Sequence, residues 1–293
     1  MTAVDLVYNP VSGSFSQAHL DALVAALGEQ GFAVTPMPTT AEGAQLSGTA
    51  ELVCVHGGDG TLRDTVQAMG AAAGKVPLAV APSGTINLVA RELGYARNPA
   101  AFAKQVADGW AKGSDGWVRA PLYRLGEMPI VSCLSIGPDS HAVARVSGKL
   151  KKRIGRYAYV VAMVQQMREW PRNAMTVRGE LADGEPFECE AEAVIVSGAA
   201  LYAGPFQLSP EAALGADAVE LITLERSTRL STMLLSLAVM LRLPLDRFAK
   251  AQIRSCRRIE FDRCVTPVQV DGDHMPDCAY AIAPSGMTLR YVV

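Results

Sequence analysis

The first 95 residues alternate between short apolar runs and segments with helical periodicity. The apolar runs predict buried strands at 5–9, 32–36, 51–55 and 77–81. Helices are predicted by apolar positions three and four residues apart, at 20–27, 62–69 and 87–93. Strands that alternate with helices in this way predict a parallel sheet with right-handed crossovers.

After Trp117 the pattern changes to short alternating runs such as FECEAEAVIVSG, AVELITL and MTLRYVV, which predict a mostly antiparallel β lobe. Two helices are expected to interrupt it, at 149–167 and at 230–243, and Pro244 ends the second. Its apolar positions Leu234, Leu237, Ala238 and Leu241 recur at helical spacing and are interpreted as core. The two textures predict two lobes, with a boundary near 118–126.

Composition narrows the class of protein. With 293 residues and 49% hydrophobic residues, the chain can build two domains, and its net charge of −2 does not indicate nucleic acid as a partner. The six cysteines show no C-x-x-C pair, which argues against zinc and favours a reducing cytosol. The N-terminus lacks a basic signal-peptide region, and the uncharged run 230–241 is too short to cross a bilayer.

The stretch VHGGDGT places Gly57, Gly58 and Gly60 between a predicted strand and a predicted helix. Without Cβ atoms, this backbone lets amide groups approach an anion beside the positive end of the helix, as in phosphate sites. An ordinary tight turn, capped by Asp59 or Thr61, is the alternative. Neither the P-loop nor the G-x-G-x-x-G fingerprint is present.

Two further loops follow predicted parallel strands, NPVSGS at 9–14 and APSGTINLVARELG at 81–94. Because the carboxyl ends of parallel strands share one edge of a sheet, the three loops are expected to converge on one ligand. Each loop alone is weak evidence, since Asn9-Pro10 could form a plain turn and Ser83-Gly84-Thr85 an ordinary helix cap.

In this order and spacing, NPVSG, GGDGT and PSGTINLVAR resemble the diacylglycerol kinase catalytic family of lipid kinases, which also includes sphingosine and ceramide kinases. The resemblance covers almost the whole chain. It implies an α/β plus β fold: an N-terminal parallel-sheet nucleotide lobe over 1–122, to which 284–293 returns, and a C-terminal β-rich sandwich lobe over 123–283 that carries the lipid site. ATP would lie in the cleft, and its γ-phosphate would be transferred to a lipid hydroxyl.

The resemblance also implies which residues hold ATP and Mg²⁺. The ATP-binding positions are Asn9, Gly57, Gly58, Asp59, Gly60, Thr61, Ser83, Gly84, Thr85 and Asn87. Asp59 would face the metal, with Asp64 and Asp217 as further metal candidates, because phosphoryl transfer needs an acid-held Mg²⁺. The chain departs from the family at Arg63-Asp64, at Leu88 and at Gly215-Ala216, so the structural magnesium site near Asp217 is in doubt.

The segment VQVDGDHMP carries Asp271 and Asp273 on either side of Gly272. Asp-Gly after an alternating strand is a strong hairpin signal, and on the residues alone a plain turn is the better interpretation. The resemblance reverses this preference. It implies that Asp271 is the general base on the lipid hydroxyl and that Asp273 supports the metal or the base.

A lipid kinase must reach a bilayer, and the basic cluster at 149–156 suits an anionic membrane surface, although a solvated helix face fits equally well. We therefore expect a cytoplasmic protein peripherally associated with the inner face of the membrane, and a homodimer is possible. The lipid acceptor stays open among diacylglycerol, ceramide, a sphingoid base or a related lipid. The alternatives are a soluble NAD kinase-like phosphotransferase and a catalytically weak, nucleotide-binding membrane-associated protein.

Overall fold

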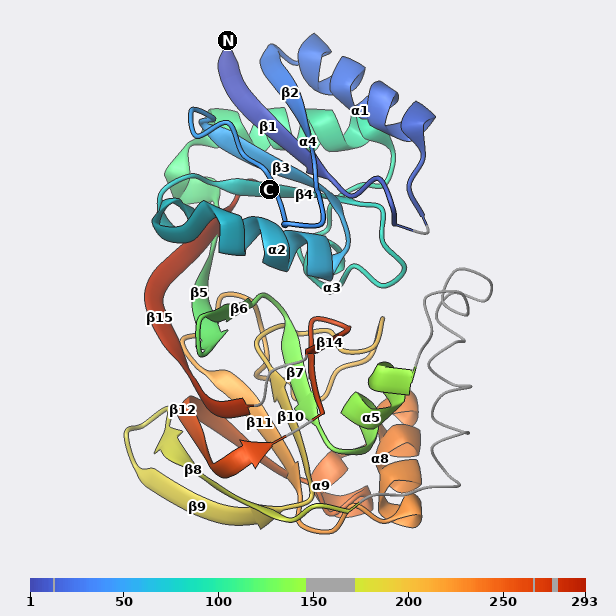
Figure 1. Cartoon of the computed structure of the whole chain (residues 1–293), viewed down its shortest axis with the longest axis vertical. Helices are drawn as coiled ribbons and strands as arrows, with labels where there is room; N and C mark the ends of the chain where they lie inside the picture. Colours follow the sequence, from blue (N-terminus) through green and yellow to red (C-terminus); the bar gives the residue numbers. More distant parts are fainter. Residues whose placement is uncertain (13, 146–171, 266, 276–278) are drawn as a thin grey trace. The chain divides into compact units, whose positions relative to one another are not determined.

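The structure is a computed structural model that describes residues 1–12, 14–145, 172–265, 267–275 and 279–293. It divides into two compact units (Figure 1): unit 1 is Met1–Leu122 with Gly286–Val293, and unit 2 is Tyr123–Ser285. The predicted helix 149–167 and the basic cluster 149–156 lie outside the described residues.

Unit 1 alternates strands and helices, as the hydrophobic pattern predicts. Its elements are β1 (Thr2–Tyr8), α1 (Gln17–Glu29), β2 (Phe32–Pro38), β3 (Leu52–Gly57), α2 (Asp59–Met69), the short 3₁₀ helix η1 (Gly70–Gly74), β4 (Leu78–Pro82), α3 (Leu88–Glu92), α4 (Pro99–Lys112) and the 3₁₀ helix η2 (Ser114–Gly116). The strands β3 and β4 are buried along their whole length. Such continuous apolar runs are typical of strands in a parallel sheet that is covered on both faces.

The sheet of unit 1 is parallel, in the order β4-β3-β1-β2. The connection from β1 to β2 steps toward one edge and the connection from β3 to β4 steps toward the other. Right-handed crossovers therefore place α1 and α2 on opposite faces of the sheet, as in Figure 1. The predicted parallel α/β lobe is confirmed.

Helix α4 was not predicted from the apolar pattern, although its start carries clear signals. The Asn98 side chain caps it by accepting a hydrogen bond from the Ala101 amide at 3.1 Å, and Pro99 is its first residue. The helix packs beside α1. Its buried residues Phe102, Ala103 and Val106 complete the core on that side of the sheet.

The chain continues with β-rich structure. The elements are β5 (Val118–Leu125), β6 (Met128–Ile130), β7 (Cys133–Ile136), α5 (Pro138–Arg145), β8 (Met175–Leu181), β9 (Pro186–Ala191), β10 (Ala193–Ser197), β11 (Val219–Leu224), α8 (Arg229–Leu241), α9 (Leu245–Phe248), β12 (Gln252–Val265), β13 (Val268–Val270), β14 (Asp273–Met275) and β15 (Ala279–Tyr291). In unit 2 the neighbours β14-β13-β7-β10-β11-β12 pair antiparallel, and β8 joins β12 with β9 outside it. The predicted β-rich C-terminal lobe is confirmed.

Two hydrophobic clusters stabilise unit 2. The larger one gathers inward-facing strand residues such as Leu134, Val194, Leu221 and Ile259, each 0% exposed. The smaller one lies under α8 and α9. Burial of apolar side chains in these clusters supplies about 25 cal/mol for each Å² removed from water.

The interpretation of α8 as an ordinary core helix is wrong for its leucines. Leu234, Leu237 and Leu241 are 37%, 48% and 58% exposed, and of the four positions named for the core Ala238 alone is buried. The helix turns Leu235, Ala238 and Val239 toward the cluster instead. The apolar spacing predicted the helix correctly. It could not predict which face is buried, because both faces carry apolar residues.

Candidate functional site

The topology of unit 1 defines one place where a ligand fits. Strands β1 and β3 are adjacent, with Tyr8 opposite His56, and the connections that leave their carboxyl ends run to opposite faces of the sheet. Such a switch point opens a crevice at the carboxyl edge of a parallel sheet. The loops after β1, β3 and β4 all begin at this edge, as the sequence predicted.

The turn after β3 requires glycine for steric reasons. Strand β3 ends at Gly57, and a Cβ placed there would lie 2.5 Å from the Cβ of Thr61. Gly58 is the N-cap of α2, and no side-chain hydrogen bond caps the helix within the described part of the chain. The amides of the first turn are thus available to an anion at the positive end of the helix.

The loop after β4 lies directly against this turn. The Ser83 amide donates to the Gly57 carbonyl oxygen at 3.2 Å. A Cβ on Gly84 would lie 2.7 Å from the Cα of Gly58 and 2.6 Å from Oδ1 of Asn87. Because a side chain at Gly84 would collide with backbone, glycine is needed here for the close approach of two main chains.

Asp59 connects the two loops through its carboxylate. Its Oδ2 accepts from the Leu88 amide at 2.8 Å and its Oδ1 from the Val89 amide at 3.0 Å, so a residue at the start of α2 caps α3. Asp59 is 8% exposed. The negative charge is stabilised by the N-terminal amides of α3, and the carboxylate fixes the loop after β4 relative to the glycine turn.

Asn87 supplies an oxygen without a partner. It is the N-cap of α3 in a left-handed conformation, with φ 55°, and its Nδ2 donates to the Gly84 carbonyl oxygen at 2.6 Å. Its Oδ1 is buried and accepts no hydrogen bond from the described residues. A buried polar atom left unsatisfied costs free energy, so this oxygen marks a position where a ligand donor or a cation would be favourable.

The remaining predicted ATP residues lie at the same edge in unit 1. Asn9 follows β1 and its Oδ1 accepts from the Val11 amide at 3.0 Å, which fixes the first loop as a turn. Thr61 is buried in the first turn of α2, whereas Thr85 is exposed and Ser83 is half-buried. The structure thus brings to one sheet edge all three loops that carry the predicted nucleotide residues.

The three predicted metal ligands come from both units: Asp59 and Asp64 belong to unit 1 and Asp217 belongs to unit 2. Among the described residues, no group of three or more His, Cys, Asp or Glu side chains is arranged to hold a metal ion. Asp64 accepts from Nη2 and Nε of Arg63 at 2.9 and 3.1 Å, and Asp217 lies in unit 2, where its carbonyl oxygen accepts from the Tyr123 hydroxyl at 3.1 Å. An ion pair of this kind neutralises the carboxylate of Asp64.

The edge of unit 1 nevertheless fits a magnesium nucleotide. Gly58 and Gly84 let the two turns approach closely, the α2 amides suit phosphate oxygens, and Oδ1 of Asn87 is a hard oxygen donor of the type Mg²⁺ prefers.

His56, near the end of β3, has an unusual setting in the structure. It stacks on His19 with ring centroids 5.2 Å apart and meets the edge of Phe15 at 6.4 Å. Both ring nitrogens are buried and lack hydrogen bonds among the described residues. Burial, with the nearby His19 as a smaller cause, lowers the pKa of His56 from 6.5 to about 4.

Asp271 is held by main chain in unit 2. It has φ 51° and Gly272 has φ 85°, which gives the two-residue hairpin turn that Asp-Gly predicted. Its Oδ1 accepts from the Ser132 amide at 2.8 Å, the Ser132 hydroxyl at 2.7 Å and the Cys133 amide at 3.1 Å, while Oδ2 accepts from the Val131 amide at 3.1 Å. The carboxylate therefore joins the turn to the start of β7.

Asp273, two residues further on, is the first residue of β14 and is half-buried. The structure thus separates the two acids of the DGD motif. Asp271 is buried with many donors, and Asp273 is accessible.

A further polar cluster in unit 2 was missed. Oδ2 of Asp139 accepts from the hydroxyls of Ser135 at 2.5 Å and Tyr202 at 2.7 Å. Burial, and then the charge of Asp139, raise the pKa of Tyr202 well above its usual value. Its residues lie in the stretches SIGPDS at 135–140 and LYAG at 201–204 of the sequence.

The three loops at the carboxyl edge of the parallel sheet belong to an α/β domain with a crevice at its switch point. The profile of the diacylglycerol kinase catalytic domain matches residues 3–116 of this domain. The resemblance to the diacylglycerol kinase catalytic family, a family of lipid kinases, is thereby confirmed.

Curated relatives agree with this assignment. The chain is 30% identical over 133 residues to a probable lipid kinase YegS-like of Pseudomonas putida, which is 43% of this chain and 41% of that protein. It is 35% identical over 129 residues to the Pseudomonas aeruginosa PAO1 relative of that name, 44% of this chain and 40% of the relative. The chain therefore spans about two fifths of these relatives. A diacylglycerol kinase of Bacillus subtilis is 24% identical over 237 residues, 78% of this chain and 75% of its own length.

Solved structures share the fold. A crystal structure of a diacylglycerol kinase from Bacillus anthracis str. Sterne has a TM-score of 0.71 at 18% identity and covers 99% of this chain and 96% of its own. In the described part of the chain, no helix combines the length and apolar character needed to cross a membrane.

Proposed function

We propose that the protein is an ATP-dependent lipid kinase that transfers the γ-phosphate to a lipid hydroxyl. The observation that carries the proposal is the contact between the turns at Gly58 and Gly84, tied together by Asp59, at the switch point of a domain that matches the diacylglycerol kinase family. The match to the profile of this family supports a lipid as acceptor.

The nucleotide residues act mainly by positioning. When bound, ATP supplies the transferable phosphoryl group and Mg²⁺ neutralises charge on its phosphates. The glycine turn after β3 offers main-chain amides to the phosphates, and Asn87 offers its Oδ1 to the metal or to a donor on the nucleotide. Asp59 fixes the two turns relative to each other, so the distances between these donors and acceptors are preserved.

We assign the role of general base to Asp273, and this differs from the assignment that the resemblance implied. Asp271 accepts four hydrogen bonds, three of them on one oxygen, so its lone pairs are largely used and its negative charge is stabilised. A general base must accept a proton from the lipid hydroxyl within hydrogen-bond reach. The half-buried Asp273 can do so, and Asp271 fixes the turn that presents it.

The acceptor and the location belong to the same proposal. A kinase of this type would meet diacylglycerol, ceramide or a sphingoid base at a membrane, so we propose peripheral association with an anionic cytoplasmic surface. Free thiols are typical of a reducing compartment, and the structure describes four of the six cysteines as free thiols: Cys54, Cys133, Cys189 and Cys256.

The experiment is a phosphorylation assay with purified protein, Mg²⁺ and ATP, and diacylglycerol, ceramide, a sphingoid base and NAD as separate acceptors. The proposal predicts a phosphorylated lipid and no phosphorylated NAD. Phosphorylated NAD would favour the soluble phosphotransferase. Nucleotide binding without transfer to any acceptor would favour the catalytically weak alternative.

A further inference from the structure

Helix α8 is fixed to unit 2 by one face. Leu235, Ala238 and Val239 are buried and contribute to the smaller hydrophobic cluster, together with Leu245 and Ala249 of the following segment. These contacts determine how the helix is rotated about its axis. The residues on the opposite face must therefore point away from the unit.

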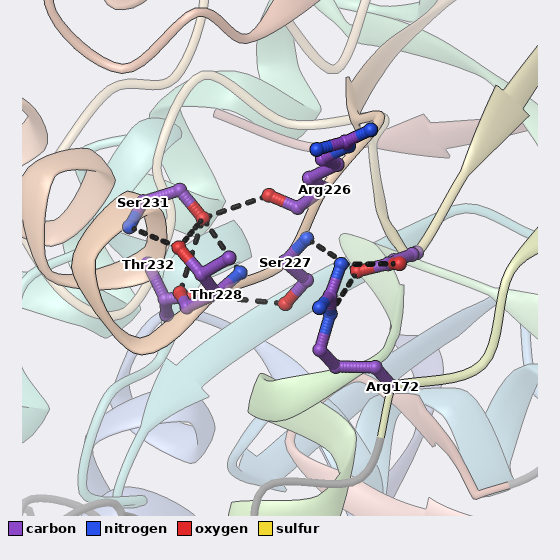
Figure 2. A network of polar contacts seen from close by, with 7 residues as sticks. Arg172, Arg226, Ser227, Thr228, Ser231 and Thr232 are labelled. Carbon is purple, nitrogen blue, oxygen red and sulfur yellow. Dashed lines mark hydrogen bonds and ion pairs between the residues drawn. The ribbon is translucent and has the colours of Figure 1, made fainter.

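The start of α8 is held by a polar network (Figure 2). Thr228 and Ser231 form a capping box: the Thr228 hydroxyl accepts from the Ser231 amide at 3.1 Å, and the Ser231 hydroxyl accepts from the Thr228 amide at 2.8 Å. The Ser227 amide donates to Oε2 of Glu192 at 2.7 Å, and Arg172 pairs with the same carboxylate. The helix is thus anchored at its N-terminus as well as along its buried face.

The face that points away from the unit is apolar. Its large side chains are 37–63% exposed, at Leu230, Met233, Leu234, Leu237, Met240 and Leu241. These positions follow the spacing i, i+3, i+4, i+7, i+10 and i+11, so they form one stripe along the helix. A contiguous exposed apolar stripe, unlike single exposed residues, indicates an interaction surface.

The chain segment that contains the stripe is basic. Exposed cationic residues precede and follow it in the chain, at Arg226, Arg229, Arg242, Arg247 and Lys250. Over 226–250 the sequence contains one acid, Asp246. A surface that combines exposed Leu and Met side chains with an excess of Arg and Lys is complementary to an anionic lipid bilayer, which offers acyl chains beneath negative headgroups.

We infer that the exposed stripe of α8 docks on an anionic membrane surface, with the leucines and methionines entering the boundary between headgroups and acyl chains and the arginines facing lipid phosphates. The inference gives the proposed lipid kinase a means of reaching its acceptor, and it rests on the proposed function for that purpose. The docking itself needs neither nucleotide nor acceptor, so it can be tested independently.

The test is co-sedimentation of the full chain with vesicles of phosphatidylcholine and with vesicles that contain about a third phosphatidylglycerol, without ATP or a lipid acceptor. We expect binding to the anionic vesicles that weakens as salt rises. The affinity of the variant Leu234→Ser/Leu237→Ser/Leu241→Ser for these vesicles should be lower by a factor of about ten or more. Arg229→Gln/Arg242→Gln should lose most of the preference for anionic vesicles. Tyr280→Ser, which removes an exposed aromatic side chain outside α8, should bind as wild type does.

Three outcomes would overturn the inference. One is unchanged vesicle binding by the triple serine variant. Another is a wild-type dimer that the triple variant converts to monomer in light scattering, since the stripe would then be an interface between copies of the chain. The third is a fall of more than about 5 °C in the unfolding temperature of the triple variant, because substitutions at solvent-exposed positions change stability little and the stripe would then be covered by the chain itself. Failure of the kinase assay alone would leave the vesicle result standing.

Discussion

Asp59 in unit 1 and Asp271 in unit 2 are both buried acids next to glycine, and both accept hydrogen bonds from main chain far away in the sequence. They differ in the hydrogen bonds that the structure describes for each carboxylate. The oxygens of Asp59 accept one amide each, from Leu88 and Val89, whereas Oδ1 of Asp271 accepts three donors and Oδ2 a fourth. The same residue type therefore connects two loops in one unit and fixes a strand to a turn in the other.

The difference distinguishes a position that suits a ligand from one that has a structural role. Beside Asp59 the structure leaves a buried oxygen of Asn87 unsatisfied and two glycine backbones in close approach, as in a ligand site. Around Asp271 the described hydrogen bonds satisfy the acid, and the accessible carboxylate is its neighbour Asp273. A motif that resembles a catalytic pair can thus divide its work between a positioning acid and a reacting one.

The largest effect is expected for Asp271→Ala. The substitution leaves three amides and the Ser132 hydroxyl without their acceptor, and it should lower the free energy of unfolding by about 4 kcal/mol. Chemical denaturation measures this. Asp273→Ala is the matched control and should change the free energy of unfolding by less than about 1 kcal/mol. Equal denaturation midpoints for Asp271→Ala and wild type would contradict the positioning role.

Asp273→Asn should reduce the rate of lipid phosphorylation about 100-fold or more with little change in stability, because the amide cannot accept the hydroxyl proton. Steady-state kinetics at saturating ATP measure this. Full turnover by Asp273→Asn, together with loss of turnover by a folded Asp271→Asn, would contradict this assignment, because Asp271 would then be the base.

Asp59→Ala should lower the free energy of unfolding by about 2–3 kcal/mol, because the Leu88 and Val89 amides lose a buried charged acceptor. It should also weaken nucleotide binding, since the loop after β4 is no longer fixed to the glycine turn. Asp21→Ala, on the exposed face of α1, serves as the control and should change neither property. An Asp59→Ala protein of wild-type stability would show that the capping contacts contribute nothing.

The parallel lobe could be predicted because the continuous apolar runs of β3 and β4 have few other interpretations. The capping of α3 by Asp59 could not, since donor and acceptor are 29 and 30 residues apart and no local pattern relates them. The same holds for Asp271, whose donors lie 138–140 residues away. Helix α4 was not predicted from the spacing of apolar residues, although Asn98-Pro99 is a capping signal at its start.

The smallest effect concerns His56. Its pKa is about 4 in the folded protein and near 6.5 when unfolded, so the unfolded chain binds a proton first as the pH falls. This contribution to stability is present above pH 6.5 and is lost as the pH falls toward 4, with about 2 kcal/mol of it lost by pH 5. His56→Phe should therefore lose less stability than wild type between these pH values. His274→Phe, at an exposed site, should follow the wild-type curve, and a parallel curve for His56→Phe would contradict the burial argument.

The central claim is that the turns at Gly58 and Gly84 hold the phosphates of a magnesium nucleotide. The most direct test is isothermal titration of a non-hydrolysable ATP analogue with Mg²⁺ into wild type, Gly84→Ala and Gly28→Ala. A Cβ at Gly84 meets the backbone of Gly58, whereas one at Gly28 meets nothing within 4 Å. The account predicts that wild type and Gly28→Ala bind the analogue with equal affinity. Gly84→Ala, whose unfolding temperature should show that it is folded, should have an affinity lower by a factor of about ten or more. Equal affinity for all three proteins, or no binding to wild type, would contradict it.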